Sequence, residues 1–275
     1  MKDIRFFMIP ASLVFLYTAI LAGNTAAKGP QLHFEAGFLS VMDHKIQFSK
    51  NGTYFDYDDN GGQDNLFFVK RYSIDLPLNE RHTVTFLYQP LLLETDALLD
   101  DSLVVDSLVY PAGTPVRFRY GFPFYRLSYL YDLWPEAERE LGIGISLQIR
   151  NATINFTSLD GTLFRSKRDI GPVPILKVRW RQPLSGAWWA GAEADGFYAP
   201  ISYLNGSDEE VTGAILDASL RFGRPVAGRG DIFLNIRYLG GGAAGTSDDD
   251  LEYGDGYVKN WLHFLTLTLG FSFGI

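Results

Sequence analysis

The sequence predicts an all-β protein whose main part is a single transmembrane, antiparallel, up-and-down β-barrel of about ten strands, within a range of about 8 to 12. Three observations predict this fold class. Hydrophobic residues make up 47% of the chain, yet beyond the N-terminal segment no apolar run reaches the roughly 18 residues of a membrane helix. Apolar and polar residues alternate instead with a period of two. The connections between the alternating segments are in turn short and long.

The N-terminal segment has the features of a secretory signal peptide. Basic residues precede an apolar run over residues 6–21, and small residues follow up to Ala27. The run is shorter than the roughly 20 residues of a spanning helix, and Pro10 interrupts it. We therefore expect residues 1–27 to be removed as a signal peptide and residues 28–275 to form the barrel.

Ten segments alternate apolar and polar residues and are the predicted strands. They cover residues 31–38, 71–76, 83–89, 115–133, 141–150, 176–181, 188–195, 214–222, 232–238 and 261–273.

The first five segments each present one apolar face. In the first, Leu32 and Phe34 alternate with His33 and Glu35. The second and third repeat this pattern, and the fourth changes its apolar parity near Pro123, which indicates a β-bulge. The fifth is the clearest, because every second residue from 141 to 149 is Leu or Ile.

The sixth to ninth segments carry charged residues opposite their apolar faces, and the tenth carries Thr, Gly and Ser there. The sixth alternates aliphatic and aromatic residues with Lys and Arg, and the seventh turns mainly alanines outward. In the eighth and ninth, Leu and Ile alternate with residues that include Asp217 and Arg237. The tenth has Leu or Phe at every odd position from 265 to 273. One face is therefore suited to lipid and the other to a polar interior.

The connections support the same layout. Short ones are expected at 77–80, 135–138, 182–185 and 223–230, and long polar ones at 43–65, 95–114, 158–171, 201–210 and 240–258. Short periplasmic turns and long external loops are typical of bacterial outer-membrane barrels, whereas a soluble β-barrel has no reason to separate its loops by length.

The C-terminus resembles the recognition signal of outer-membrane barrels. In that pattern a polar residue, a glycine, a hydrophobic residue and a hydrophobic end are spaced as Thr268, Gly270, Phe273 and Ile275 are here, although Ile275 replaces the usual aromatic end. The resemblance implies the barrel-assembly machinery as a partner during biogenesis. Residues 111–116 and 125–129 also resemble a family of outer-membrane barrel proteins of unassigned activity, which adds to the fold alone.

The inward positions of the predicted strands carry charges of both signs. The predicted lumen-lining residues are Glu35, Arg71, Asp75, Arg126, Asp132, Arg150, Lys177, Arg179, Arg181, Glu193, Asp195, Asp217, Arg221 and Arg237.

Two interpretations of these charges remain open. An ion-pair network would fill a narrow lumen, with Lys177, Arg179 and Arg181 matched by Glu193 and Asp195 on the next strand. Alternatively, the basic residues would line a channel for small polar or anionic solutes. A ten-stranded barrel is too narrow for an open porin-like bore, which favours the network.

A third function class is a hydrolase of lipid or peptide at the outer rim. His44, next to Asp43, and His263 are the histidines at a suitable depth, but His263 shares the outward parity of Trp261 and is expected in an aromatic girdle. The acidic segment 56–61 begins like a calcium loop, but Phe67 stands where the bidentate Glu is required. We therefore expect no catalytic residues, metal or cofactor.

The sequence thus predicts a non-enzymatic integral protein of the bacterial outer membrane, structural or interacting through its loops with a surface partner that is not identified. Its net charge of −8 argues against nucleic-acid binding, and it contains no cysteine. The expected surroundings are outer-membrane lipid and lipopolysaccharide.

Overall fold

The computed structural model describes residues 29–134, 136, 138–200, 211–226, 228, 230–246 and 254–275. The predicted signal peptide, residues 1–27, lies outside the described residues. In the part of the chain that is described, no helix is both long enough and apolar enough to cross a membrane.

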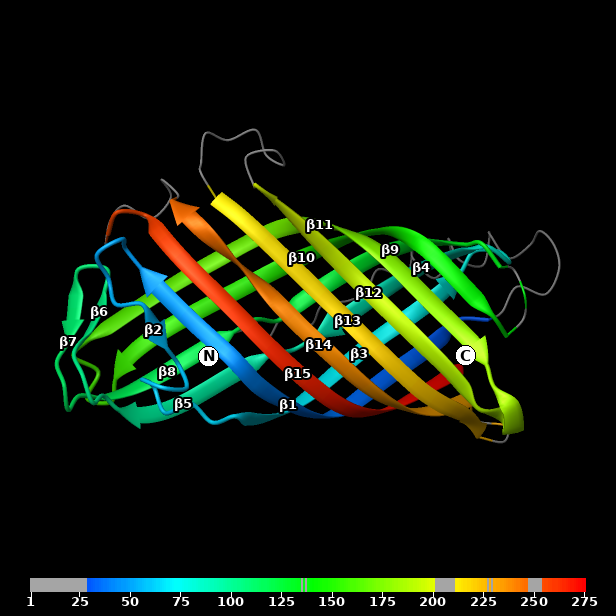
Figure 1. Cartoon of the computed structure of the whole chain (residues 1–275), viewed down its shortest axis with the longest axis horizontal. Helices are drawn as coiled ribbons and strands as arrows, with labels where there is room; N and C mark the ends of the chain where they lie inside the picture. Colours follow the sequence, from blue (N-terminus) through cyan, green and yellow to red (C-terminus); the bar gives the residue numbers. More distant parts are fainter. Residues whose placement is uncertain are drawn as a thin grey trace, which may run out of the picture.

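Ten antiparallel strands form a closed barrel (Figure 1). Each barrel strand pairs with its neighbours along the chain, and pairing of the last strand with the first closes the ring. The predicted fold class and strand number are confirmed. In ring order the strands are β1 (Gln31–Phe48), β3 (Leu66–Pro77), β4 (His82–Gln89), β9 (Phe124–Asp132), β10 (Glu140–Ser158), β11 (Phe164–Pro183), β12 (Trp189–Pro200), β13 (Val211–Val226), β14 (Gly230–Thr246) and β15 (Tyr257–Gly274).

Two prolines interrupt neighbouring strands of the barrel wall. The chain continues beyond Pro90 as β5 (Leu92–Leu98), and β8 (Pro115–Gly121) precedes β9 across Pro123. β8 pairs with the far half of β10, and β5 pairs with β8.

Proline has no N–H to donate to a strand ladder, so each break is local. The register continues across both, because Phe124 pairs with Gln89 and Arg150 while Gly121 pairs with Leu92 and Thr153. The β-bulge expected near Pro123 was wrong, because no extra residue is inserted there. The apolar parity changes instead because inward side chains of β8, such as Phe118 and Tyr120, fill an apolar interior.

The same interruption leaves a gap in the strand pairing. β3 pairs with β4 from Tyr72 to Pro77, and in the described residues no strand pairing joins β3 residues 66–71 to β5. We call the facing edges of β3 residues 66–71 and of β5 the β3–β5 seam.

The two ends of the barrel differ. Strand β2 (Phe55–Asp56), the hairpin of β6 (Leu103–Val105) and β7 (Leu108–Tyr110), β5 and β8 gather at one end, which we call the long-loop end (Figure 1). The C-terminus lies at the opposite end, the short-turn end, where β3 is followed by β4, β9 by β10, β11 by β12 and β13 by β14. The turn at 184–188 includes the short 3-10 helix η1 (Ser185–Ala187).

Several strands run farther toward the long-loop end than the sequence predicts. The segment 158–171, expected as a long loop, is mostly strand, and only residues 159–163 connect β10 to β11. The alternation continues through this region with its sense reversed, because polar Asn155 points outward while Phe156 is buried. A prediction that requires apolar residues at outward positions therefore places the end of the strand too early.

An exposed apolar belt surrounds the middle of the barrel and its short-turn end. Ile145 on β10 is 64% exposed and Leu267 on β15 is 51% exposed. Tyr72, Tyr88 and Tyr125 stack side by side on three adjacent strands toward the long-loop end of the belt. Water does not stabilise so large an apolar surface, whereas lipid does, and aromatic rings favour the boundary between the two. This belt identifies the barrel as transmembrane.

The interior changes character along the axis. Within the belt the buried side chains are mainly polar or charged, whereas toward the long-loop end they form one apolar cluster that includes Leu39, Leu93, Phe118 and Phe156. The outward side chains change in the opposite direction, as Glu94 and Arg117 are half exposed there. The long-loop end is therefore packed like a water-soluble β-barrel.

Candidate functional site

Arg126 lies at the centre of a buried charge network and is 1% exposed. Its Nη1 lies 2.9 Å from Asp195 Oδ2 and 3.0 Å from Asp217 Oδ2. Its Nε and Nη2 donate to Gln148 Oε1 at 3.0 and 2.6 Å. A buried guanidinium is tolerated only with such partners. Arg126 on β9 thereby joins β10, β12 and β13 across the bore.

Lys177 supplies a second cation from β11. Its Nζ lies 2.8 Å from Asp195 Oδ2 and 3.1 Å from Glu193 Oε1. Ser146 donates its hydroxyl to the other oxygen of Asp195 at 3.1 Å. Both oxygens of this fully buried carboxylate therefore have partners.

Arg71 and Arg237 meet at Asp217. Arg71 Nη2 lies 3.3 Å from Asp217 Oδ2, and its Nη1 donates to Gln89 Oε1 at 2.6 Å. Arg237 Nη1 donates to Asp217 Oδ1. Asp217 thus receives charged donors from β3, β9 and β14.

Glu35 connects the first strand with the last three. Its Oε2 accepts hydrogen bonds from Asn235 at 2.5 Å and from Thr268 at 2.9 Å. Arg221 Nη2 lies 3.4 Å from Oε1. These partners belong to β14, β15 and β13.

These side chains form what we call the ion-pair core. It contains five cations and four carboxylates, namely Arg71, Arg126, Lys177, Arg221, Arg237, Glu35, Glu193, Asp195 and Asp217. Each cation lies against at least one carboxylate, so the core is a connected ion-pair network, with one cation in excess, that fills the bore at the level of the lipid.

The remaining predicted lumen residues lie nearer the short-turn end, with one exception. Asp75, Asp132, Arg179 and Arg181 line a cavity there. The side chain of Arg150 lies outside the described residues. The pairing expected for Arg179 and Arg181 was wrong, because these residues bind other carboxylates while Lys177 takes Glu193 and Asp195.

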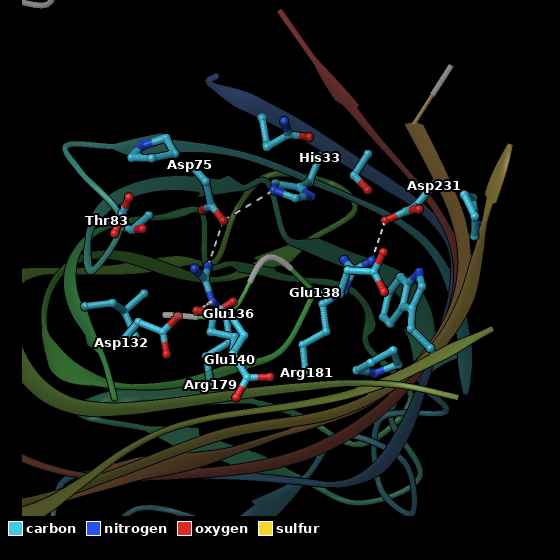
Figure 2. A pocket seen from close by; sticks show the side chains of 18 of the residues that line it. His33, Asp75, Thr83, Asp132, Glu136, Glu138, Glu140, Arg179, Arg181 and Asp231 are labelled. Atoms are coloured by element: carbon cyan, nitrogen blue, oxygen red, sulfur yellow. Dashed lines mark hydrogen bonds and ion pairs between the residues drawn. The ribbon is translucent and has the colours of Figure 1, made fainter. Parts of the chain in front are cut away.

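The cavity at the short-turn end has a volume of about 620 Å³ (Figure 2). We call it the vestibule. Its inner side is formed by Arg179, which lies 2.7 Å from both Asp75 on β3 and Glu140 on β10. His33 Nε2 lies 3.5 Å from the same Asp75 carboxylate. Nearer the rim, Arg181 Nη2 lies 2.8 Å from Asp231 Oδ2. Side chains from opposite walls therefore meet where the vestibule joins the barrel interior.

The opposite end of the bore is closed by aromatic rings. The imidazole of His44 stacks on Tyr57 at 4.0 Å between ring centroids, and Tyr57 also packs against Phe55, Phe118 and Phe156. We call this set, with Tyr120, the aromatic plug. Burial raises the pKa of the Tyr57 phenol well above its usual range, so this ring is uncharged at neutral pH.

The two histidines considered for hydrolysis have other surroundings. His44 is fully buried, and its Nδ1 lies 3.2 Å from Gln63 Oε1. His263 Nδ1 is hydrogen-bonded to the Tyr238 hydroxyl. In the described part of the chain neither imidazole is hydrogen-bonded to a serine or to a carboxylate, the contact that a nucleophile–base pair requires.

The four residues of the C-terminal pattern have different positions. Thr268 points inward to Glu35, and Gly270 lies beneath the ring of Phe233, where an added Cβ would come within 2.2 Å of ring atoms. Phe273 is 41% exposed on the apolar belt, and the Ile275 N–H donates to Pro30. Each therefore also has a role in barrel packing, whatever it does in recognition.

Comparison with known proteins gives fold-level likenesses. No family model matches the chain, and no curated protein matches its sequence. Among solved structures, it is similar to the outer membrane protease OmpT of Escherichia coli, with 12% identity, a TM-score of 0.45 and coverage of 91% of this chain and 99% of that one. It is also similar to a Pseudomonas aeruginosa FadL homologue, with 6% identity, a TM-score of 0.40 and 90% coverage of both chains. A third is OprG of P. aeruginosa, with 10% identity, a TM-score of 0.32 and coverage of 91% and 99%. Such likenesses select no function.

The aromatic plug and the vestibule were not predicted from the sequence. The plug has a signal, because Phe118 and Tyr120 alternate with Arg117 and Arg119, opposite to the lipid-facing pattern. The vestibule has none, because its carboxylates lie at strand ends and in turns that come together only when the barrel closes. Among the described residues no group of three or more His, Cys, Asp or Glu is arranged to hold a metal ion.

Proposed function

We propose that the chain is a closed, non-enzymatic barrel of the bacterial outer membrane that holds its long-loop end rigidly at the cell surface for contact with a surface partner. The single observation that carries this proposal is the ion-pair core, in which Arg126 bridges four strands across the bore. The aromatic plug supports it, since it fills the bore again beyond the core.

The proposed setting follows from the surface of the barrel. The apolar belt requires a bilayer, and the closed antiparallel barrel with unequal ends is the architecture used in bacterial outer membranes. We propose export by a signal peptide cleaved after residue 27, insertion by the barrel-assembly machinery and contact with lipopolysaccharide. In this orientation the short-turn end faces the periplasm and the long-loop end faces outward.

The alternative of an anion channel has less support. The cations of the core are held by carboxylates, so they do not offer an unpaired positive lining to a passing anion. The vestibule has more carboxylates than guanidiniums and therefore repels anions at the periplasmic entrance. A hydrolase has less support still, given the surroundings of His44 and His263.

Planar-bilayer conductance tests the proposal. We expect the purified mature protein to show no unitary current steps, and we expect Arg179→Ala, which removes the inner side of the vestibule, to remain silent because the core lies beyond it. Unitary steps in the unmodified protein would contradict a closed barrel. If those current steps also lost their anion preference in Arg179→Glu, the anion-channel function would replace the closed-barrel proposal.

A further inference from the structure

We propose that the vestibule is a binding site for a small organic ligand that carries primary ammonium groups and is drawn from the periplasm. This inference rests on the proposed orientation, in which the short-turn end faces the periplasm, but not on the proposed role of the long-loop end.

The size and position of the vestibule suit a small molecule. Its volume of about 620 Å³ lies within the roughly 300–1,000 Å³ of typical ligand sites. Residues from all ten barrel strands line it, and the bridge from Arg179 to Asp75 and Glu140 bounds it on the inside. The site is therefore a pocket closed on its inner side and open to one compartment.

The vestibule has an excess of negative charge. Seven carboxylates line it, against three guanidiniums: Asp75, Glu80, Asp132, Glu136, Glu138, Glu140 and Asp231 face Arg81, Arg179 and Arg181. Carboxylates that line a concave site focus the electric field there. The local concentration of cations therefore rises.

The built-in cations leave specific carboxylates unmatched. Arg179 and Arg181 are engaged by three of the acids, as described above, and Glu136 pairs with Arg139 at 3.0 Å. Arg81 Nη1 donates to the backbone carbonyl of Asp132 at 3.3 Å. Within the described residues, Glu80 and Glu138 have no cation at ion-pair distance. The carboxylate of Asp132 is fixed by the N–H groups of Trp134 and Leu141 at 2.9 and 3.0 Å. These three carboxylates are available to a cationic ligand.

The arrangement favours an extended organic cation over a metal ion. Glu80 lies in the turn after β3, whereas Asp132 and Glu138 lie at the β9–β10 turn, and no described group of carboxylates converges enough to hold a metal. A ligand with ammonium groups several bonds apart can reach separate carboxylates. Trp189, which also lines the vestibule, is 6% exposed and its indole N–H has no acceptor in the described structure. This donor could serve a hydroxyl or carbonyl oxygen of the ligand.

Calorimetric titration of the folded full barrel in detergent tests the site. The probes are 1,5-diaminopentane, spermidine and a lysine-containing tripeptide amide, with Mg²⁺ and glutamate as comparison solutes. We expect the amines to bind, glutamate not to bind, and the double variant Glu80→Gln/Glu138→Gln to bind amines about tenfold more weakly. The first two probes represent free amines and the third a peptide source, so their ranking identifies which source the vestibule prefers.

The matched control is Asp59→Asn/Asp101→Asn, which removes two exposed carboxylates at the long-loop end and changes the net charge equally. Its affinity for amines should equal that of the unmodified protein, and heat-modifiable gel migration should show all variants folded. Equal weakening in both double variants, tighter binding of Mg²⁺ than of any amine, or no amine binding would each overturn the proposal. A silent bilayer recording would leave this proposal unaffected, so the two can fail independently.

Discussion

At the scale of single residues, the position of a charged side chain along the barrel determines whether its ion pair is buried or exposed to water. Arg126 is buried against Asp195 and Asp217, whereas Arg117 is half exposed and pairs with Asp96 at 2.6 Å. Both are arginine–aspartate pairs, yet water screens the second and not the first. Their contributions to stability should therefore differ severalfold.

Arg126→Ala should lower the free energy of unfolding by about 3–5 kcal/mol, because it leaves two buried carboxylates short of a cation. Arg117→Ala, the control at a solvent-exposed pair, should leave the free energy of unfolding nearly unchanged. Urea unfolding in lipid vesicles, followed by tryptophan fluorescence, measures both. Equal losses for the two variants would show that the ion-pair core is not the buried network described here.

Residue-level prediction from the sequence succeeded where parity alone decides the position. The alternation that places Leu265 and Leu267 in lipid also places Thr266 and Thr268 inside, so inward residues could be identified without coordinates. Partners could not be identified, because Arg179 meets Asp75 across the barrel from strands far apart in the ring. Spacing along the chain carries no information on such contacts.

At the scale of elements, β10 keeps one alternation of inward and outward side chains through two environments. Its outward residues are apolar in the lipid-facing belt, and its inward residues are apolar at the long-loop end. Ile149 on β10 faces lipid, whereas Ile154 and Phe156, farther along the same strand, are buried inside. The sequence marks this change only by polar residues appearing at outward positions, which also mark a loop. For that reason the predicted strands were too short at the long-loop end.

The aromatic plug should behave as an ordinary protein core. Phe156→Ala should lower the free energy of unfolding by about 3–5 kcal/mol, because a buried aromatic side chain leaves a cavity. Phe164→Ala, at an exposed ring in the next strand, should change it by no more than about 0.5 kcal/mol. The temperature at which the folded gel band disappears gives the comparison, and matching shifts would contradict a packed plug.

The β3–β5 seam predicts uneven protection of backbone amides. Amides of β3 residues 66–71 that face the seam lack a strand partner there, whereas β10 residues 143–149 pair on both sides. We expect hydrogen–deuterium exchange to be faster for peptides of the first segment than of the second. Equal protection would mean that the seam is closed by pairing in the membrane.

At the scale of the whole molecule, the barrel has three zones along its axis: the vestibule, the ion-pair core and the aromatic plug. Sequence patterning predicted the closed barrel, its strand number and its charged interior, because each depends on a period of two repeated over many residues. It did not predict the zones, because they arise when the ring closes and side chains from distant strands share one interior. The succession of vestibule, ion-pair core and aromatic plug along the axis is therefore set by tertiary structure.

The contacts of Glu35 bear on how the barrel inserts into the membrane. Its hydrogen-bond partners Asn235 and Thr268 lie 200 and 233 residues later in the chain. Until the last strands arrive, the first strand would carry an unsatisfied carboxylate into a region without water, so a half-inserted sheet gains little from remaining in the bilayer. Insertion should then behave as one committed step in which the final strand, arriving with Thr268, completes the partners of the first.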